Sequence, residues 1–140
     1  MSVGRSRCFL DTNILVYAWS DKDISKHEQA RLILSERIKL NSAVISTQVL
    51  QEFFNVVTTK MGCDKLVAKE AMMRFSRIPH VEVNLALIQE AIDISILSQL
   101  SFWDSLVIAS AEHANCRVLY TEDLNDGQTI RGVRITNPFI

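Results

Sequence analysis

The order of hydrophobic and polar positions predicts short strands that alternate with longer helices. Short apolar runs, typical of buried strands, lie at residues 7–11, 43–45, 118–120 and 133–135, and an alternating, less buried run lies at 81–83. Apolar residues recur at helical spacing over residues 25–40, 47–60, 64–77, 87–99 and 103–114. An apolar segment that follows a polar loop at 11–13 predicts one more helix.

Residues that favour helix ends support these boundaries. Ser46 or Thr47 is placed to cap the helix after the second strand, and Gly62 interrupts the chain where that helix ends. Asp64 is placed as the N-cap of the next helix, which Pro79 prevents from continuing.

Strands separated by helices predict a mainly parallel sheet, because right-handed crossovers place the helices on both of its faces. We therefore expect an α/β protein with a three-layer α/β/α fold around a central sheet of about five strands. The chain has 140 residues, of which 48% are hydrophobic, and no repeat or linker interrupts it. These features predict a single domain over residues 1–140.

Four acidic residues stand where predicted strands end or helices begin: Asp11, Glu52, Asp104 and Asp123. Parallel sheets of this kind bind ligands at the carboxyl ends of their strands, so we expect these side chains to converge in one cleft. Carboxylates in otherwise apolar segments repel one another unless a cation neutralises them, and hard divalent ions prefer oxygen ligands. The pattern indicates a metal-dependent enzyme, which we interpret as a nuclease.

Three of these acids also have a purely structural explanation. Ser101 precedes Asp104 by three residues, which is the spacing of a capping box at a helix start. Asp11 is also suited to turning the chain after its strand. Glu52 is also able to reach solvent from the edge of its apolar helix face.

The fourth acid has close competitors along the chain. Glu122 precedes Asp123 directly, and Asp126 follows it within a turn. Aspartate is common in turns for its own hydrogen bonding to the backbone. The sequence therefore leaves open which of the three acids joins the others.

Charge and composition narrow the function further. A formal net charge of -1 argues against nonspecific coating of nucleic acid, so contact with a polyanion needs a local basic patch or a bound cation. The three cysteines lack CxxC spacing, and their odd number favours a reducing, cytoplasmic location. The three histidines form no cluster, which argues against a zinc site. No apolar stretch approaches the roughly 18 residues of a membrane span. Candidate phosphate contacts are Lys22, Lys26, Lys60, Lys65 and Lys69.

The ordered set of motifs resembles the PIN-domain ribonuclease family. DTN follows an apolar strand, a serine stands six residues before a helical glutamate, WD opens an apolar helix, and TED follows a strand. The likeness extends from about residue 8 to residue 135. The short chain further resembles the VapC-type toxins of prokaryotic toxin–antitoxin pairs.

The resemblance implies an endoribonuclease that depends on Mg²⁺ or Mn²⁺. It implies that Asp11, Glu52, Asp104 and Asp123 hold the metal and carry the catalysis. Within this set we assign Asp11 and Asp104 to the primary site and Glu52 and Asp123 to outer or second-site positions, and the sequence leaves open whether one ion or two are bound. The resemblance also implies an RNA substrate, a cognate antitoxin and a homodimer. Polar residues that match the family's support around the acids are Asn13, Ser46 and Thr121, and an apolar surface for the dimer is offered by Leu66, Val67, Met72, Met73 and Phe75.

Two other classes of protein remain in view. A Mg²⁺-dependent phosphoryl-transfer or phosphatase-like domain also places Asp at a strand end, but the residues at 11–13 lack the second Asp of the phosphatase motif. A PIN-like RNA-binding module without catalysis would share the fold. Retention of all four acids argues against that module.

Overall fold

The computed structural model of the protein describes residues 6–140. Its centre is a six-stranded sheet in the order β3-β2-β1-β4-β6-β5, in which all neighbours are parallel except β5 and β6. The predicted α/β class and mainly parallel sheet are confirmed. The strands are β1 (Cys8–Leu10), β2 (Ala43–Ser46), β3 (His80–Val81), β4 (Val118–Tyr120), β5 (Thr129–Ile130) and β6 (Val133–Thr136).

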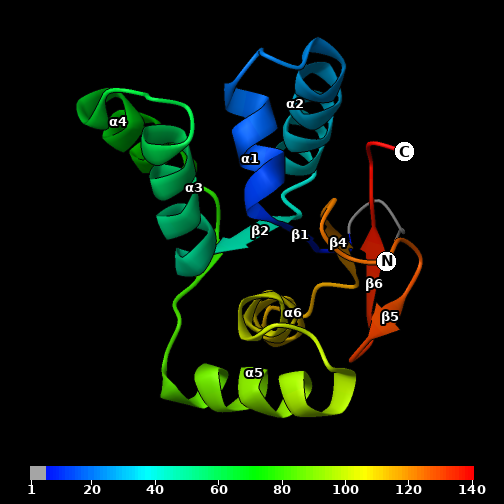
Figure 1. Cartoon of the computed structure of the whole chain (residues 1–140). Coiled ribbons are helices and arrows are strands. Elements are labelled where there is room, and N and C mark those ends of the chain that lie inside the picture. The colour runs from blue at the N-terminus through cyan, green and yellow to red at the C-terminus, as the bar shows by residue number, and fades with distance from the viewer. Residues whose placement is uncertain (1–5) are drawn as a thin grey trace.

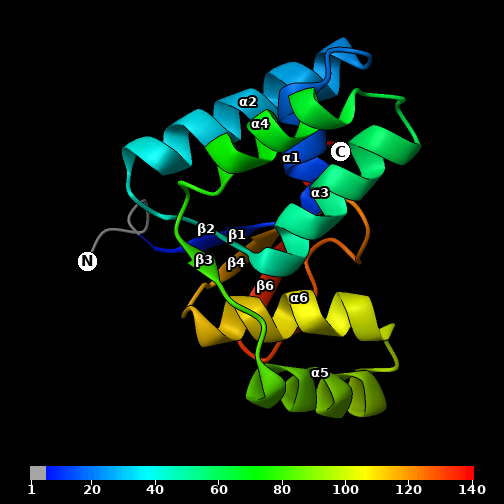
Figure 2. The same ribbon diagram turned by 90° about the vertical axis from the view of Figure 1, so that its left-hand side faces the viewer.

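Helices cover both faces of the sheet and complete the predicted three layers. Four helices lie on one face, and α6 lies on the other, with α5 packed outside it (Figures 1 and 2). Because both faces are covered, β1 and β2 are buried along their whole length. The helices are α1 (Thr12–Trp19), α2 (Ile24–Lys39), α3 (Thr47–Thr59), α4 (Lys65–Phe75), α5 (Leu85–Ser98) and α6 (Phe102–His113).

An aromatic cluster joins three helices of the first layer. The ring of Phe53 on α3 meets the ring of Trp19 on α1 at 6.2 Å and that of Phe75 on α4 at 5.0 Å, both edge to face. Phe53 is fully buried. Edge-to-face packing adds to the burial of these rings, so the helix that carries Glu52 is held firmly between its neighbours.

The structure corrects the number of strands. The sheet has six strands rather than about five, because β5 pairs with β6 in an antiparallel hairpin. The loop of this hairpin is Arg131–Gly132, and both residues have positive φ, 53° and 77°. Such a two-residue loop matches the twist of the strands it joins, but only one of its two residues is a glycine.

Two helix starts also differ from the prediction. Helix α1 begins at Thr12, directly after β1, so residues 11–13 form a helix start rather than a loop. Asn84 caps α5 through a hydrogen bond from the Leu87 N–H, and the third strand ends at Val81. The polar Asn84 follows Val83 as it would in an alternating strand, but it is the N-cap of α5.

The order of the strands reverses between β1 and β4. From β1 the chain passes to β2 and β3 on one side, and later to β4 and β6 on the other. The carboxyl ends of β1 and β4 lie together, because the Asp11 N–H donates to the Tyr120 carbonyl oxygen at 3.1 Å. Crevices of parallel sheets form at such a switch in strand order.

Within residues 6–140, no single helix is long and apolar enough to span a membrane, and the pair α5 and α6 meets that composition only together, across a bend of 117°.

Candidate functional site

Asp11 is the buried centre of the site. Its side chain caps α1 and is 5% exposed. One oxygen, Oδ1, accepts from the Thr12 N–H at 2.7 Å, and Oδ2 accepts from the Thr121 hydroxyl at 2.8 Å. Burial raises the pKa of Asp11 to about 7, and the charges of Asp123 and Glu52 add to this rise. The carboxylate therefore lies where negative charge is costly.

Glu52 approaches Asp11 from α3. Its Oε2 accepts from the Thr12 hydroxyl at 3.0 Å, and its Oε1 accepts from the Gln48 side-chain amide at 2.8 Å. The alternative that Glu52 simply reaches for solvent is wrong, because both of its oxygens are bound within the protein. Ser46 supports Glu52 indirectly: its hydroxyl oxygen accepts from the Val49 N–H at 3.3 Å and so fixes the start of α3.

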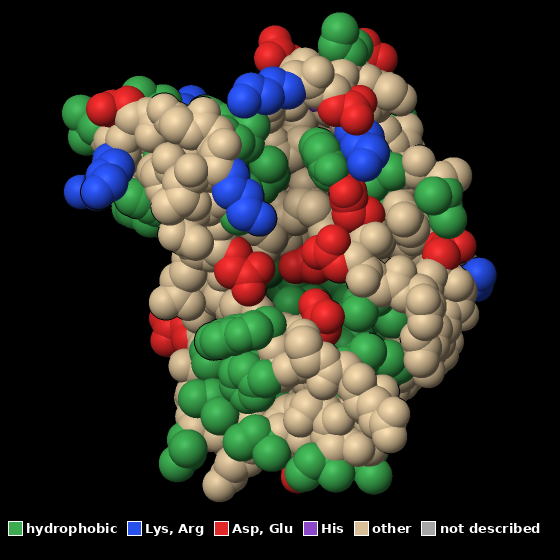
Figure 3. All heavy atoms as spheres, in the orientation of Figure 1, with side chains coloured by type: hydrophobic (Ala, Val, Ile, Leu, Met, Phe, Trp, Pro, Cys, Tyr) green, Lys and Arg blue, Asp and Glu red, His purple; other side chains and the backbone are tan. Residues whose placement is uncertain are grey.

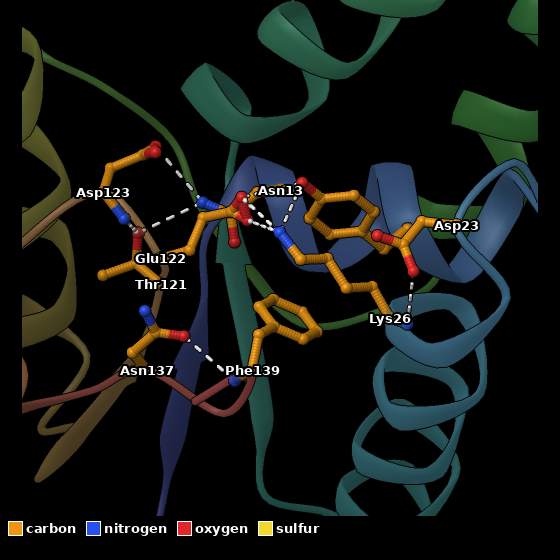
Figure 4. Close-up of polar contacts among 9 residues, drawn as sticks. Asn13, Asp23, Lys26, Thr121, Glu122, Asp123, Asn137 and Phe139 are labelled. Atoms are coloured by element: carbon orange, nitrogen blue, oxygen red, sulfur yellow. Dashed lines mark hydrogen bonds and ion pairs between the residues drawn. The ribbon is translucent and has the colours of Figure 1, made fainter.

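Asp123 approaches the same point from the loop after β4. The Asn13 side-chain amide donates both to Asp123 Oδ2 and to the Thr121 hydroxyl, each at 3.2 Å (Figure 4). The Asp123 N–H also donates to the Thr121 hydroxyl oxygen at 3.1 Å. Burial raises the pKa of Asp123, and the charges of Glu122 and Asp104 add to it. Thr121 thus links two acids from neighbouring strands.

The two competitors of Asp123 are occupied elsewhere. Glu122 accepts from the Tyr17 hydroxyl at 2.7 Å and pairs with Lys26 at 3.3 Å (Figure 4). Asp126 accepts from the Asn137 N–H at 2.8 Å and holds the chain after β6. Of the three neighbouring acids, Asp123 is the one that Asn13 and Thr121 bind.

Asp104 lies in the capped first turn of α6 and also beside the site. The Ser101 hydroxyl oxygen accepts from the Asp104 N–H at 3.1 Å, so the expected cap at the start of α6 is present. The charge of Asp104 nevertheless raises the pKa of Asp123. Asp104 therefore interacts electrostatically with the acids of the site. Acidic side chains gather in a hollow between α1 and α3 on one side and α6 on the other (Figure 3).

Comparison with known proteins relates this arrangement to a family. The sequence profile described as PIN domain matches residues 8–126, which include all four acids. The chain belongs to the PIN domain family. A search of curated proteins finds no match to the sequence.

Solved structures similar to this PIN domain include toxins and their complexes. VapC20 of Mycobacterium tuberculosis, described as a sarcin–ricin-loop-cleaving toxin, has a TM-score of 0.66 and 19% identity, covering 80% of this chain and 86% of that chain. A toxin–antitoxin complex from Klebsiella pneumoniae has a TM-score of 0.69 and 18% identity, covering 94% and 97%. VapBC2 from Rickettsia felis, bound to a promoter DNA fragment, has a TM-score of 0.66 and 23% identity, covering 93% and 97%. At these identities the likeness is one of fold.

The lysines of this PIN domain differ in their surroundings. Lys26, one of the predicted phosphate contacts, instead binds Glu122 and the Tyr17 hydroxyl and lies over the rings of Tyr17 and Phe139. Lys60 is exposed, and its charge lowers the pKa of Asp123. Of the five candidate lysines, Lys60 is therefore the one whose charge acts on an acid of the site. Exposed on helices or their flanks are Lys22, Lys65 and Lys69.

Sequence reasoning missed two side chains that hold Glu52. Thr12 stands inside the DTN motif, but nothing in the sequence indicates a partner for its hydroxyl. Gln48 precedes Glu52 by four residues, so both lie on one face of α3, and that spacing was the signal available. Both residues are buried polar side chains, with exposures of 7% and 3%.

The donor set of this PIN domain suits a hard cation. Asp11, Glu52, Asp104 and Asp123 offer only carboxylate oxygens, the ligands that Mg²⁺ and Mn²⁺ prefer. The carboxylates of Asp11, Glu52 and Asp123 accept hydrogen bonds from protein groups. Among the described residues 6–140, no three acidic, His or Cys side chains form a group that could hold a metal ion. Among the described residues, three buried side-chain atoms have no hydrogen-bond partner: Asn13 Oδ1, Gln48 Oε1 and Ser105 Oγ. Asn13 and Gln48 also hold Asp123 and Glu52 through their amide nitrogens. The costly charge on Asp11 and these unpaired atoms fit a site completed by a cation.

Proposed function

We propose that this PIN domain is a ribonuclease that depends on Mg²⁺ or Mn²⁺. The observation that carries the proposal is the gathering of acids around buried Asp11, where the strand order switches between β1 and β4. Like charges are brought together there at a cost, and a divalent cation removes that cost. The residues proposed to bind the metal at its primary site are Asp11 and Asp104. Glu52 and Asp123 are proposed as further ligands.

A cation held there would polarise the phosphate and lower the pKa of a bound water, which is the chemistry that phosphodiester hydrolysis needs. The protein's own part is to hold the carboxylates in place. Thr121 fixes Asp11, Thr12 and Gln48 fix Glu52, and Asn13 fixes Asp123. Such outer contacts commonly change metal affinity or activity by about 10–100-fold when they are removed.

We further propose that the protein is the toxin of a toxin–antitoxin pair, and that it forms a homodimer. The similar folds of a VapC toxin and of two toxin–antitoxin complexes support the first proposal. For the dimer, the exposed side chains on α4 offer an apolar surface, whereas Met72 and Phe75 pack partly against the core. The exposed residues are Leu66, Val67 and Met73.

The purified protein is expected to cleave RNA when Mg²⁺ or Mn²⁺ is present and to stop when EDTA removes the metal, because the metal supplies the attacking water. Cleavage is followed by gel electrophoresis of ribosomal RNA, transfer RNAs and a generic RNA, since a selective toxin would ignore many substrates. Equal cleavage with and without EDTA would exclude the metal mechanism. Metal binding without cleavage of any of these RNAs would favour the inactive RNA-binding module.

The surroundings of the fourth acid make a separate prediction. We expect Asp123→Asn to lose cleavage and Asp126→Asn to keep it, because Asp123 faces Asn13 whereas Asp126 holds the Asn137 N–H. Asparagine can still accept that backbone hydrogen bond. Rates for both variants are measured on one RNA at saturating Mg²⁺. The reverse result would mean that the wrong residue has been assigned to the site.

A further inference from the structure

Gln48 stands between two of the acids proposed to hold the metal. It lies in the first turn of α3, one turn before Glu52, and is 3% exposed. Its side-chain Nε2 donates to Glu52 Oε1 at 2.8 Å and to the carbonyl oxygen of Trp103 at 3.1 Å. Trp103 directly precedes Asp104 in α6. One amide nitrogen therefore touches the acid of one helix and the backbone beside the acid of another.

We propose that Gln48 is a positioning residue that fixes the Glu52 carboxylate relative to the start of α6, and hence relative to Asp104. This inference rests on the proposed metal-dependent function. It assigns no contact with substrate to Gln48, which would act through Glu52 and through the position of α6. Gln48 would thereby set the spacing of the ligands that meet the cation.

The chemistry of the two contacts fixes the orientation of the amide. A carboxylate oxygen and a carbonyl oxygen are both acceptors. Turning the Gln48 amide around would bring its own oxygen against both of them. Only the NH₂ group can satisfy the two acceptors, so the amide has one orientation in this site.

The hydrogen bond from Gln48 to the Trp103 carbonyl oxygen connects α3 with α6, which pack in different layers. Helix α3 packs against α1 and α4 on one face of the sheet, whereas α6 packs against α5 and against strands from the other face (Figure 1). The hydrogen bonds of Gln48 therefore join α3 directly to the start of α6, whereas both helices also pack against the shared strand β2. The other oxygen of Glu52 is held by Thr12 of α1, so Gln48 supplies the second fixed point of that carboxylate.

The rest of the Gln48 side chain argues against a purely structural purpose. Its Oε1 is buried and has no hydrogen-bond partner among the described residues. A buried polar atom without a partner lowers stability. A methionine of similar length would avoid that cost, but it would lose the donor to Glu52. The value of glutamine at this position therefore lies in its donor group.

The test compares Gln48→Met with Gln51→Met, a control at an exposed glutamine of the same helix. Mn²⁺ affinity is measured by isothermal titration calorimetry, and kcat and KM are measured on a cleaved RNA. We expect Gln48→Met to bind Mn²⁺ about 10–100-fold more weakly and to lower kcat more than it raises KM. We expect Gln51→Met to match the wild type. Circular dichroism checks that each variant folds, and Gln48→Asn, which keeps the amide but is too short to bridge, replaces Gln48→Met if that variant does not fold.

A double variant separates positioning from simple loss of stability. If Gln48 acts through Glu52, the effect of Gln48→Met on Mn²⁺ affinity should largely vanish in a Glu52→Gln background, because effects of coupled residues do not add. Wild-type affinity in the folded Gln48→Met and Gln48→Asn variants would overturn the inference. So would an undiminished effect in the Glu52→Gln background. Failure of the wild type itself to bind Mn²⁺ would instead overturn the proposed function, and the role of Gln48 with it.

Discussion

Replacing Asp11 with asparagine is expected to slow RNA cleavage by at least about 100-fold. A metal ion contributes several kcal/mol to a hydrolysis of this kind, and each 1.36 kcal/mol is about a factor of ten in rate. Asp11 lies at the centre of the acids, with its charge coupled to Glu52 and Asp123. The substitution keeps the shape and the cap of α1, since asparagine is a good N-cap, so the loss should be one of chemistry and not of folding.

The matched control is Asp93→Asn, which neutralises an exposed aspartate on α5. Cleavage rates are compared on one RNA at the same Mg²⁺ concentration, after circular dichroism has shown that both variants are folded. The control should cleave like the wild type. An Asp11→Asn variant within about threefold of the wild type, a difference of less than 1 kcal/mol in activation free energy, would remove Asp11 from the catalytic group.

The same substitution is expected to stabilise the protein at neutral pH when no divalent metal is present. Burial raises the pKa of Asp11 from the ordinary 3.8 to about 7. A carboxyl whose pKa is raised in the folded state contributes stability that is complete below the ordinary pKa and is lost as the pH rises through the folded value. The wild type should therefore lose stability from about pH 4 to pH 7, by an amount up to about 4 kcal/mol.

Urea unfolding in EDTA at pH 4.5 and pH 8 measures this effect. We expect the free energy of unfolding of Asp11→Asn to exceed that of the wild type by more at pH 8 than at pH 4.5, because asparagine carries no charge at either pH. Asp93→Asn gives the baseline for a charge removed from the surface. A difference between Asp11→Asn and the wild type that is the same at both pH values would show that the Asp11 carboxyl bears no such penalty.

Much of the fold could be predicted because the hydrophobic patterns of its helices extend over many residues. The helical period of α2, α3 and α4 runs over several turns, and the buried strands β1, β2 and β4 interrupt it clearly. The strand β5 has two residues and an exposed Thr129, so no run of apolar residues marks it. Its pairing depends on the turn at Arg131–Gly132, where an arginine adopts a positive φ that a sequence pattern does not indicate.

The acids could be picked out because charged residues are unusual beside buried strands. Their partners could not be found in the same way. The hydrogen bonds from Thr12 to Glu52 and from Thr121 to Asp11 join residues that are 40 and 110 positions apart, and only the parallel order of β2, β1 and β4 brings them together. The resemblance assigned Asp123 as the fourth acid, but sequence spacing did not exclude Glu122 or Asp126. The contacts of Glu122 with Tyr17 and Lys26, and of Asp126 with Asn137, distinguish those two acids from Asp123.

The most direct test of a metal site shared by the four carboxylates is a thermal melting series in which Mg²⁺ is titrated at constant ionic strength, so that site binding is separated from general screening. At about ten times its dissociation constant, Mg²⁺ should stabilise the wild type by about 1.4 kcal/mol if it binds only the folded state. Asp93→Asn should respond in the same way, whereas Asp11→Asn, Glu52→Gln, Asp104→Asn and Asp123→Asn should each gain clearly less. An identical response in the wild type and all four site variants would contradict the claim that these carboxylates share a metal site.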